Sequence, residues 1–417
     1  MAAGVCLFGL ALSLISAGPL HSPALFSHIL AANRPTGFLL LSPRPKAVGL
    51  WRQEEKAAPA GKVKLSGVLN IDSRWMKRAD FTDKASPSSS DLYMRKIEAG
   101  LEGDFADWVS VTAVLNSEWL QDPLNQGDEK VAVDEAHLDL NIPGTPLFLV
   151  AGKRSQPFGL FENYLITDPM TMDAYETKKV GLTAGLNGPL DSRIALSLYK
   201  GTEQMDHLFQ SGLFDALAVT RMPGGAPAKV NSFVVSASVS PAGKTLTLFS
   251  AYLSEPGYGR RNTTLNLGWN LVLPSANLLF DGDYMKALSR EAYPTVDRVI
   301  KEAVLSVTAS YVFVLRERTV KGSGTYRGRK SHRYAHPVEV ALRYEHFDDD
   351  GMSALVDSWS TRSRVSLGGR YSFYEHDKTA AYFEAELRRQ NYRVSSLLQP
   401  AMGPGNTEFY LMLGVDF

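Results

Sequence analysis

Two short stretches of this sequence carry side chains that could bind a metal ion or transfer a proton. Glu135, His137 and Asp139 occupy alternate positions, so an extended chain places all three on one face. An imidazole between two carboxylates can ligate a metal or act in acid–base catalysis. The other stretch, Asp348 to Gly351, resembles the start of a calcium-binding loop, but the later ligands and the closing Glu are absent. We interpret the first stretch as inward-facing polar residues that line a lumen, and the second as a loop that is solvated or bridged by divalent ions to lipopolysaccharide.

Other catalytic signatures are missing from the sequence. It contains no phosphate-binding loop, no HExxH and no G-x-S-x-G. Cys6 is the single cysteine, so a chain that loses its N-terminal stretch has no thiol for a disulfide, a zinc site or a nucleophile. We therefore assign no catalytic residue, no metal ligand and no cofactor, and we expect a protein that is not an enzyme.

The composition narrows the class of protein further. The 417 residues include 44 basic and 44 acidic side chains, so the formal net charge is zero and no nucleic-acid partner is expected. The mean hydropathy of −0.13 is too low for a helical membrane protein. It suits a transmembrane β-barrel, in which apolar residues alternate with polar ones. Aromatic residues make up 10% of the chain, enough for girdles at the membrane interfaces.

The N-terminal region reads as an export signal followed by a connecting segment. Residues 1–17 contain an apolar core that is typical of a signal peptide, although no basic residue precedes Arg34. A buried helix of the mature protein is the alternative. Residues 18–61 are interpreted as a leader remnant or periplasmic extension and a linker. The sequence does not fix a cleavage site.

From Lys62 to the C-terminus, apolar and polar residues alternate with a period of two. Segments of this kind recur about sixteen times, the even number that single-chain bacterial barrels need. The last segment, Thr407 to Phe417, alternates in the same way and ends in an aromatic residue. It resembles the closing strand of an outer-membrane barrel, whose terminal Phe is part of the signal read by the barrel assembly machinery. An ordinary edge strand of a soluble sheet is the alternative.

The connections between these segments alternate in length. Long odd connections, such as 78–90, 120–130 and 201–229, alternate with tight even ones that contain Gly, Pro, Asn, Asp or Ser. We predict an all-β fold for residues 62–417, a transmembrane antiparallel β-barrel of about sixteen strands with long outer loops and short periplasmic turns. The basic segment 317–336 breaks the rule, because a periplasmic turn is expected there, and its role is not assigned.

The predicted inward faces of the strands carry both signs of charge, with acidic groups slightly ahead. A field of one sign would favour ions of the opposite sign, so strong phosphate selectivity is not expected. These inward positions are Lys96, Glu98, Glu102, Asp104, Glu135, His137, Asp139, Asp281, Asp283, Glu339, Arg343, Glu345, Arg364, Arg370, Glu384, Glu386 and Arg388.

The third outer loop, residues 154–178, is too apolar for a fully solvated loop. Phe158, Phe161 and Tyr164 need a surface to pack against. We expect the loop to fold into the barrel and narrow its lumen, with its apolar side on the wall and its acidic groups lining the constriction. The alternative is a loop that caps the barrel or packs at a subunit contact.

This loop resembles the LbtU family of siderophore porins, which carries a G-K-x-x-x-P-F-G-x-F-E segment followed by I-S-D-P-x-T and E-T. The matching residues are Gly152, Lys153, Pro157, Phe158, Gly159, Phe161, Glu162, Ile166, Asp168, Pro169, Thr171, Glu176 and Thr177. Departures are Asn163, Tyr164, Thr167 and Tyr175. The phosphate-selective porin family shares a looser G-K-x-x-x-P-F-G and is the nearest competitor. The resemblance implies ligand uptake through an outer-membrane channel without a plug domain.

These observations predict a porin in the outer membrane of a Gram-negative bacterium. It would take up a small polar solute, with an iron-siderophore as the sharper hypothesis. The predicted ligand or constriction residues are Lys153, Arg154, Pro157, Phe158, Gly159, Phe161, Glu162, Tyr164, Asp168 and Glu176. Expected partners are membrane lipid and lipopolysaccharide, the assembly machinery through Phe417, and the solute; an oligomer is compatible with the sequence. The alternatives are a general or anion-type porin, a barrel phospholipase or protease, and a non-transporting structural barrel.

Overall fold

The structure is a computed structural model, and its described residues all belong to one compact unit, Lys46–Phe417. The described residues are 62–121, 130–201, 213–214, 230–241, 245–257, 259–293, 298–299, 301–321, 331–355, 357–376 and 379–417. The predicted signal peptide, residues 1–17, and the segment 18–61 lie outside them.

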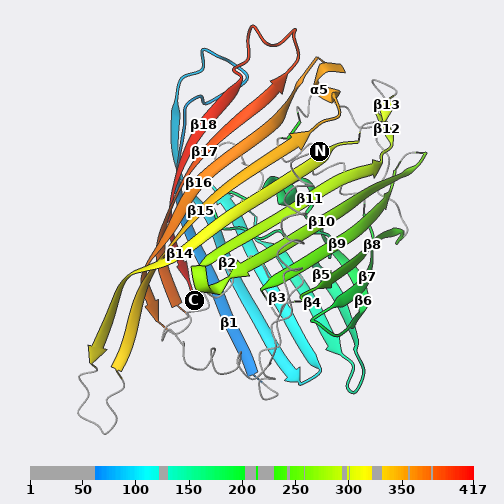
Figure 1. The fold of residues 1–417 in the computed structure, drawn as a ribbon, viewed down its shortest axis with the longest axis vertical. Coiled ribbons are helices and arrows are strands. Elements are labelled where there is room, and N and C mark those ends of the chain that lie inside the picture. Colours follow the sequence, from blue (N-terminus) through cyan, green and yellow to red (C-terminus); the bar gives the residue numbers. More distant parts are fainter. Residues whose placement is uncertain are drawn as a thin grey trace, which may run out of the picture. The chain divides into compact units, whose positions relative to one another are not determined.

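Sixteen antiparallel strands close into a barrel in the described part of the chain (Figure 1). The barrel strands are β1 Lys62–Met76, β2 Ser89–Ala106, β3 Val109–Leu120, β4 Ala132–Asn141, β5 Leu147–Ser155, β6 Lys178–Asn187, β7 Arg193–Tyr199, β8 Ser232–Val239, β9 Leu246–Pro256, β10 Arg261–Leu273, β11 Leu278–Ser289, β14 Ala303–Lys321, β15 Ser331–Asp348, β16 Trp359–His376, β17 Thr379–Val394 and β18 Gly405–Asp416. Each strand pairs with its neighbours in sequence, and β1 pairs with β18 to close the wall. The short strands β12 Ala292–Tyr293 and β13 Arg298–Val299 form a separate hairpin.

The two faces of the wall differ as the alternation requires. Leu101, Leu267 and Leu413 are between 42% and 49% exposed on the outer face. Asn266 and Glu386 are fully buried on the inner face. Such apolar-out, polar-in alternation around a closed sheet is the pattern of a transmembrane barrel, and it confirms the predicted all-β architecture. No helix in the described part of the chain is long and apolar enough to cross a bilayer.

The basic segment 317–336 does not form the short periplasmic turn that the alternation of the connections predicts. Its two flanks continue the antiparallel ladder, from Arg316 opposite His336 to Lys321 opposite Ser331. These flanks pair only with each other, because the pairing of β11 with β14 ends at Tyr311 and the pairing of β16 with β15 begins at Val338. The strands β14 and β15 therefore project as a hairpin past their neighbours (Figure 1). Residues 322–330 at its tip lie outside the described residues.

The chain terminus lies against a glycine of the first strand. Phe417 and Gly67 exchange two backbone hydrogen bonds, of 2.8 and 3.0 Å. A Cβ atom at Gly67 would lie 2.3 Å from Cζ of the Phe417 ring. Only a residue without a side chain leaves room for this ring, so the last residue of the chain takes part in barrel closure.

A Gly67→Val substitution should impair closure. The valine side chain would displace the Phe417 ring, at a cost of about 1–3 kcal/mol for the overpacked site. We expect less heat-modifiable, folded barrel per unit of protein made. Ala99→Val is the matched control, because Ala99 lies directly opposite Gly67 on β2 and its side chain is exposed. Equal folded yields from the two variants would contradict this account of the terminus.

Candidate functional site

The third loop, residues 156–177, leaves β5 and returns to β6 through the short helix α3, Met170–Tyr175. Phe158, Met170 and Tyr175 are fully buried. They form one apolar cluster with side chains from the inner wall, including Tyr199, Val234, Leu253, Met285, Val304 and Phe347. These wall residues come from β7 to β15, so the apolar side of the loop is packed inside the barrel.

Acidic side chains of the wall bind the backbone of the loop. The Asp283 carboxylate on β11 accepts hydrogen bonds from the amides of Leu160 and Phe161, each at 3.2 Å. The Glu386 carboxylate on β17 accepts from the Thr167 amide at 2.8 Å and from its hydroxyl at 2.6 Å. Hydrogen bonds to charged acceptors are stronger than neutral ones. They hold two separate points of the loop against distant strands.

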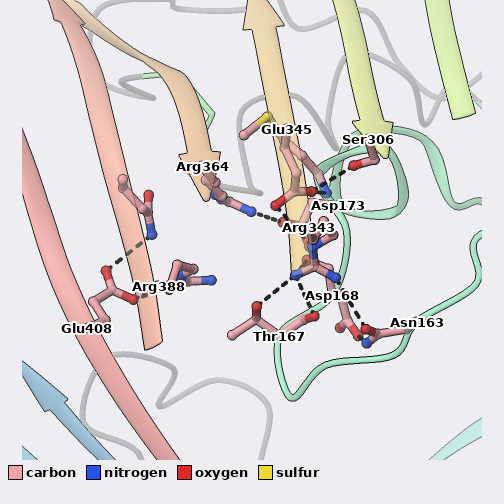
Figure 2. A network of polar contacts seen from close by, with 12 residues as sticks. Asn163, Thr167, Asp168, Asp173, Ser306, Arg343, Glu345, Arg364, Arg388 and Glu408 are labelled. Carbon is pink, nitrogen blue, oxygen red and sulfur yellow. Dashed lines mark hydrogen bonds and ion pairs between the residues drawn. The ribbon is translucent and has the colours of Figure 1, made fainter. Parts of the chain in front are cut away.

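Arg343 on β15 makes the largest set of contacts with the loop (Figure 2). Its guanidinium donates to the Thr167 carbonyl at 2.8 Å, to the Thr167 hydroxyl at 2.9 Å and to Asn163 Oδ1 at 3.2 Å. Its Nε lies 3.2 Å from Glu345 Oε2. Glu345 in turn accepts from Ser306 Oγ at 2.7 Å and from the Met170 amide. The Arg343–Glu345 pair thus joins the loop to β15 and, through Ser306, to β14.

Three further contacts add to the anchoring. Arg364 on β16 pairs with Asp173 at 2.7 Å (Figure 2). Arg95 on β2 lies 3.9 Å from Asp168. The Tyr175 hydroxyl donates to Glu302 at 2.8 Å. Because the anchors come from β2, β11 and β15 to β17, the loop crosses the lumen.

The predicted site residues take different places. Arg154, Pro157, Phe158 and Gly159 are buried at the root of the loop. Phe158 is enclosed by the wall and anchors the loop instead of offering a surface to a solute. Lys153 lies on the outward face of β5 and donates to the Val133 carbonyl. It therefore does not line the constriction, because side chains alternate across a strand.

The remaining predicted residues keep part of their surface open. Phe161, Glu162 and Tyr164 are half-buried. The Tyr164 hydroxyl lies 3.5 Å from Asn270 Nδ2. Asp168 accepts from Asn163 Nδ2 at 2.8 Å, and Glu176 accepts from Ser155 Oγ at 2.8 Å. These side chains shape the loop, and those of Phe161, Glu162, Tyr164 and Asp168 are the ones placed to meet a solute.

The two stretches with metal-like or acid–base patterns have internal partners. His137 lies 3.2 Å from Asp139 and 4.0 Å from Glu135 on β4. The Asp349 carboxylate accepts from the Gly351 amide, the Ser353 amide and Ser360 Oγ. Within the described residues, no group of three or more His, Cys, Asp or Glu side chains is arranged to hold a metal ion. Neither stretch is assigned a reactive role.

Glu162 is a loop carboxyl whose pKa is raised by its surroundings. Enclosure between the loop and the wall raises its pKa to about 7, and the nearby Asp283 charge adds to the shift. Its ordinary value is 4.5. A folded-state pKa above the unfolded value means that the folded barrel holds the proton more tightly, so stability falls as the pH rises between these two values.

A Glu162→Gln variant should therefore be more stable than the native barrel at about pH 8, by a few degrees in unfolding temperature. The two proteins should converge below about pH 4.5, where the carboxyl is protonated in both the folded and the unfolded state. Unfolding temperatures measured from the gel shift of the heated barrel test this. A difference that is constant with pH would contradict the assigned titration.

No protein-family model and no curated protein sequence matches this chain. Solved structures do share its fold. The outer membrane channel DcaP of Acinetobacter baumannii aligns with a TM-score of 0.55 at 11% identity, over 88% of this chain and 100% of DcaP. OmpF of Salmonella typhi, solved with daunomycin, aligns with a TM-score of 0.54 at 12% identity, over 86% of this chain and 98% of OmpF. Both are outer-membrane porins with a 16-strand barrel. The chain has this porin fold, and with its apolar outer face it is an outer-membrane barrel.

Proposed function

We propose that this barrel is a porin through which small polar solutes diffuse, and that the third loop forms its constriction. The position of the loop carries the proposal. Anchors on opposite parts of the wall hold a whole outer loop inside a polar lumen, where it reduces the open cross-section. A loop fixed at this many points favours a permanent, passive channel, because moving it would break several charge-assisted hydrogen bonds together.

A channel also accounts better than an enzyme for the use of the polar side chains. Asp283, Arg343, Glu345 and Glu386 are occupied in anchoring the loop. A barrel hydrolase with its catalytic groups at the rim is the competing proposal. It predicts hydrolysis of a lipid or peptide that is lost when His137 is replaced, whereas the porin proposal predicts no such activity.

Purified protein in planar lipid bilayers tests the proposal. We expect stepwise, stable current increments as single barrels insert. An outer-membrane barrel that is correctly folded, as judged by heat modifiability, but never conducts would overturn the channel proposal. It would favour a structural role instead.

For the solute, we propose a ferric siderophore. The support is the sequence resemblance of residues 152–177 to siderophore porins, together with the half-buried aromatic side chains of Phe161 and Tyr164 at the constriction. Ferric siderophores added to one side should block the single-channel current in a concentration-dependent way. Phe161→Ala should weaken that block. If no ferric siderophore from a panel of different charges affects the current, a general porin is the better description.

A further inference from the structure

The wall beside the loop carries a group of polar, oxygen-bearing side chains. Asn270 on β10 is directly opposite Asp281 on β11, and Gly268 is opposite Asp283. Glu162 and Tyr164 of the loop lie above this part of the wall, since the Tyr164 hydroxyl is 3.5 Å from Asn270. We call Glu162, Tyr164, Asn270 and Asp281 the acidic face.

Asp281 is the unusual member of the acidic face. Its side chain is buried, with the residue only 5% exposed, and its Oδ2 atom accepts no hydrogen bond. No cationic side chain of the described residues lies within ion-pair distance of Asp281 or Glu162. Asn266, on the same face of β10, also has an unpartnered, fully buried Oδ1 atom. A buried carboxylate oxygen without a partner is costly, and a bound proton or another cation relieves that cost.

Several basic groups of the lumen already have acidic partners other than Asp281 and Glu162. Arg364 pairs with Asp173 at 2.7 Å, and Arg370 pairs with Asp416 at 3.1 Å. The same holds for Arg388 with Glu408, whose contact is drawn in Figure 2. These basic groups are each neutralised by an acidic neighbour. These three arginines therefore do not neutralise Asp281 or Glu162.

We propose that the acidic face is a binding subsite for a univalent cation, either an inorganic ion such as K⁺ or the protonated amine of a solute. Carboxylate, amide and phenol oxygens suit both, because K⁺ is coordinated by oxygens and an ammonium group donates hydrogen bonds to them. A divalent metal fits less well, since the described residues hold no group of three suitable ligands. The role of this subsite in ion selectivity rests on the proposed porin function.

The subsite has a consequence for selectivity. An unpaired negative charge in a narrow, low-dielectric passage raises the local concentration of cations and repels anions. The channel should therefore prefer cations, although its overall charge is zero. Among ferric siderophores, cationic or neutral complexes should enter more readily than strongly anionic ones.

Reversal potentials in a KCl gradient at about pH 8, above the pKa of Glu162, test the inference. The native channel should prefer K⁺ over Cl⁻, and Asp281→Asn should lower that preference about two- to fourfold. Asp139→Asn is the matched control, because it removes one lumen carboxylate that already has His137 as a neighbour; it should change the ratio little. An anion-selective native channel, or an unchanged ratio in Asp281→Asn, would overturn the inference while leaving the porin proposal intact.

A second measurement does not depend on conduction. The detergent-solubilised barrel should unfold at a higher temperature in KCl or propylammonium chloride than in an equal concentration of N-methylglucamine chloride, because a ligand of the folded state stabilises it. Asp281→Asn should lose this difference. A larger effect of propylammonium than of K⁺ would identify an amine as the preferred cation. The proposed subsite would be overturned if the native barrel unfolded at the same temperature in all of these salts, or if only CaCl₂ raised its unfolding temperature. This outcome can be read even if the barrel passes no current in bilayers.

Discussion

Shortening the third loop should raise the single-channel conductance about two- to fivefold, because conduction through a constriction depends on its open width. The change replaces residues 157–175 with a short Gly-Ser connection between β5 and β6. It removes Phe158 and Met170 from the lumen while both strands keep their partners in the wall. The measurement is the current step of single inserted barrels at fixed voltage and salt concentration.

A similar replacement in the first outer loop, residues 82–86, is the control. This segment bonds mainly to its own turn and to residues 399–401 of the last outer loop. Its removal should leave the current step within the scatter of the native channel. An unchanged step after shortening the third loop would mean that the loop does not set the width of the pore.

Replacing Arg343 with Ala should be the most destabilising single change among the loop anchors. Arg343 is 1% exposed, and its loss would leave the carboxylate of Glu345 buried without its cation. Breaking a buried ion pair from one side costs about 3–5 kcal/mol. The hydrogen bonds to Thr167 and Asn163 would be lost as well. The expected results are a markedly lower unfolding temperature and a larger, noisier current step from the released loop.

Arg370→Ala is the matched control for this prediction. Arg370 also pairs with an acid, Asp416, and its guanidinium lies over the Tyr382 ring, but it is more exposed and makes no contact with the loop. It should lower stability less and leave the current noise unchanged. The double variant Arg343→Ala with Glu345→Gln should cost less than the sum of the two single changes, because the residues share one interaction. Equal effects of Arg343→Ala and Arg370→Ala would contradict the anchoring role.

The barrel could be predicted because its signal is local. Period-two alternation at positions such as Leu411, Leu413 and Val415 depends only on one strand having a lipid side and a lumen side. The inward orientation of Asp283, Arg343 and Glu386 followed from the same alternation. The apolar composition of the third loop also pointed to the interior, since exposed loops rarely carry so many aromatic residues.

The partners of the loop could not be predicted, because they depend on contacts across the barrel. Thr167 and Glu386 are 219 residues apart, and neither segment carries a pattern that indicates its contact with the other.

A β-bulge in β2 also departs from the predicted alternation of side chains. At the register shift after Asn70, Arg95 and Lys96 both turn inward, whereas strict alternation would place only one of them there. The strands at the flanks of segment 317–336 could not be predicted either, because their charged residues do not give the apolar–polar alternation of a barrel strand.

The most direct test of the proposed channel function is the current through the unmodified barrel in a planar bilayer. A channel narrowed by its third loop should give discrete, voltage-independent steps that are smaller than those of the loop-shortened protein and that carry more K⁺ than Cl⁻. A folded, heat-modifiable barrel that inserts and yet passes no ionic current, with or without its third loop, would contradict it.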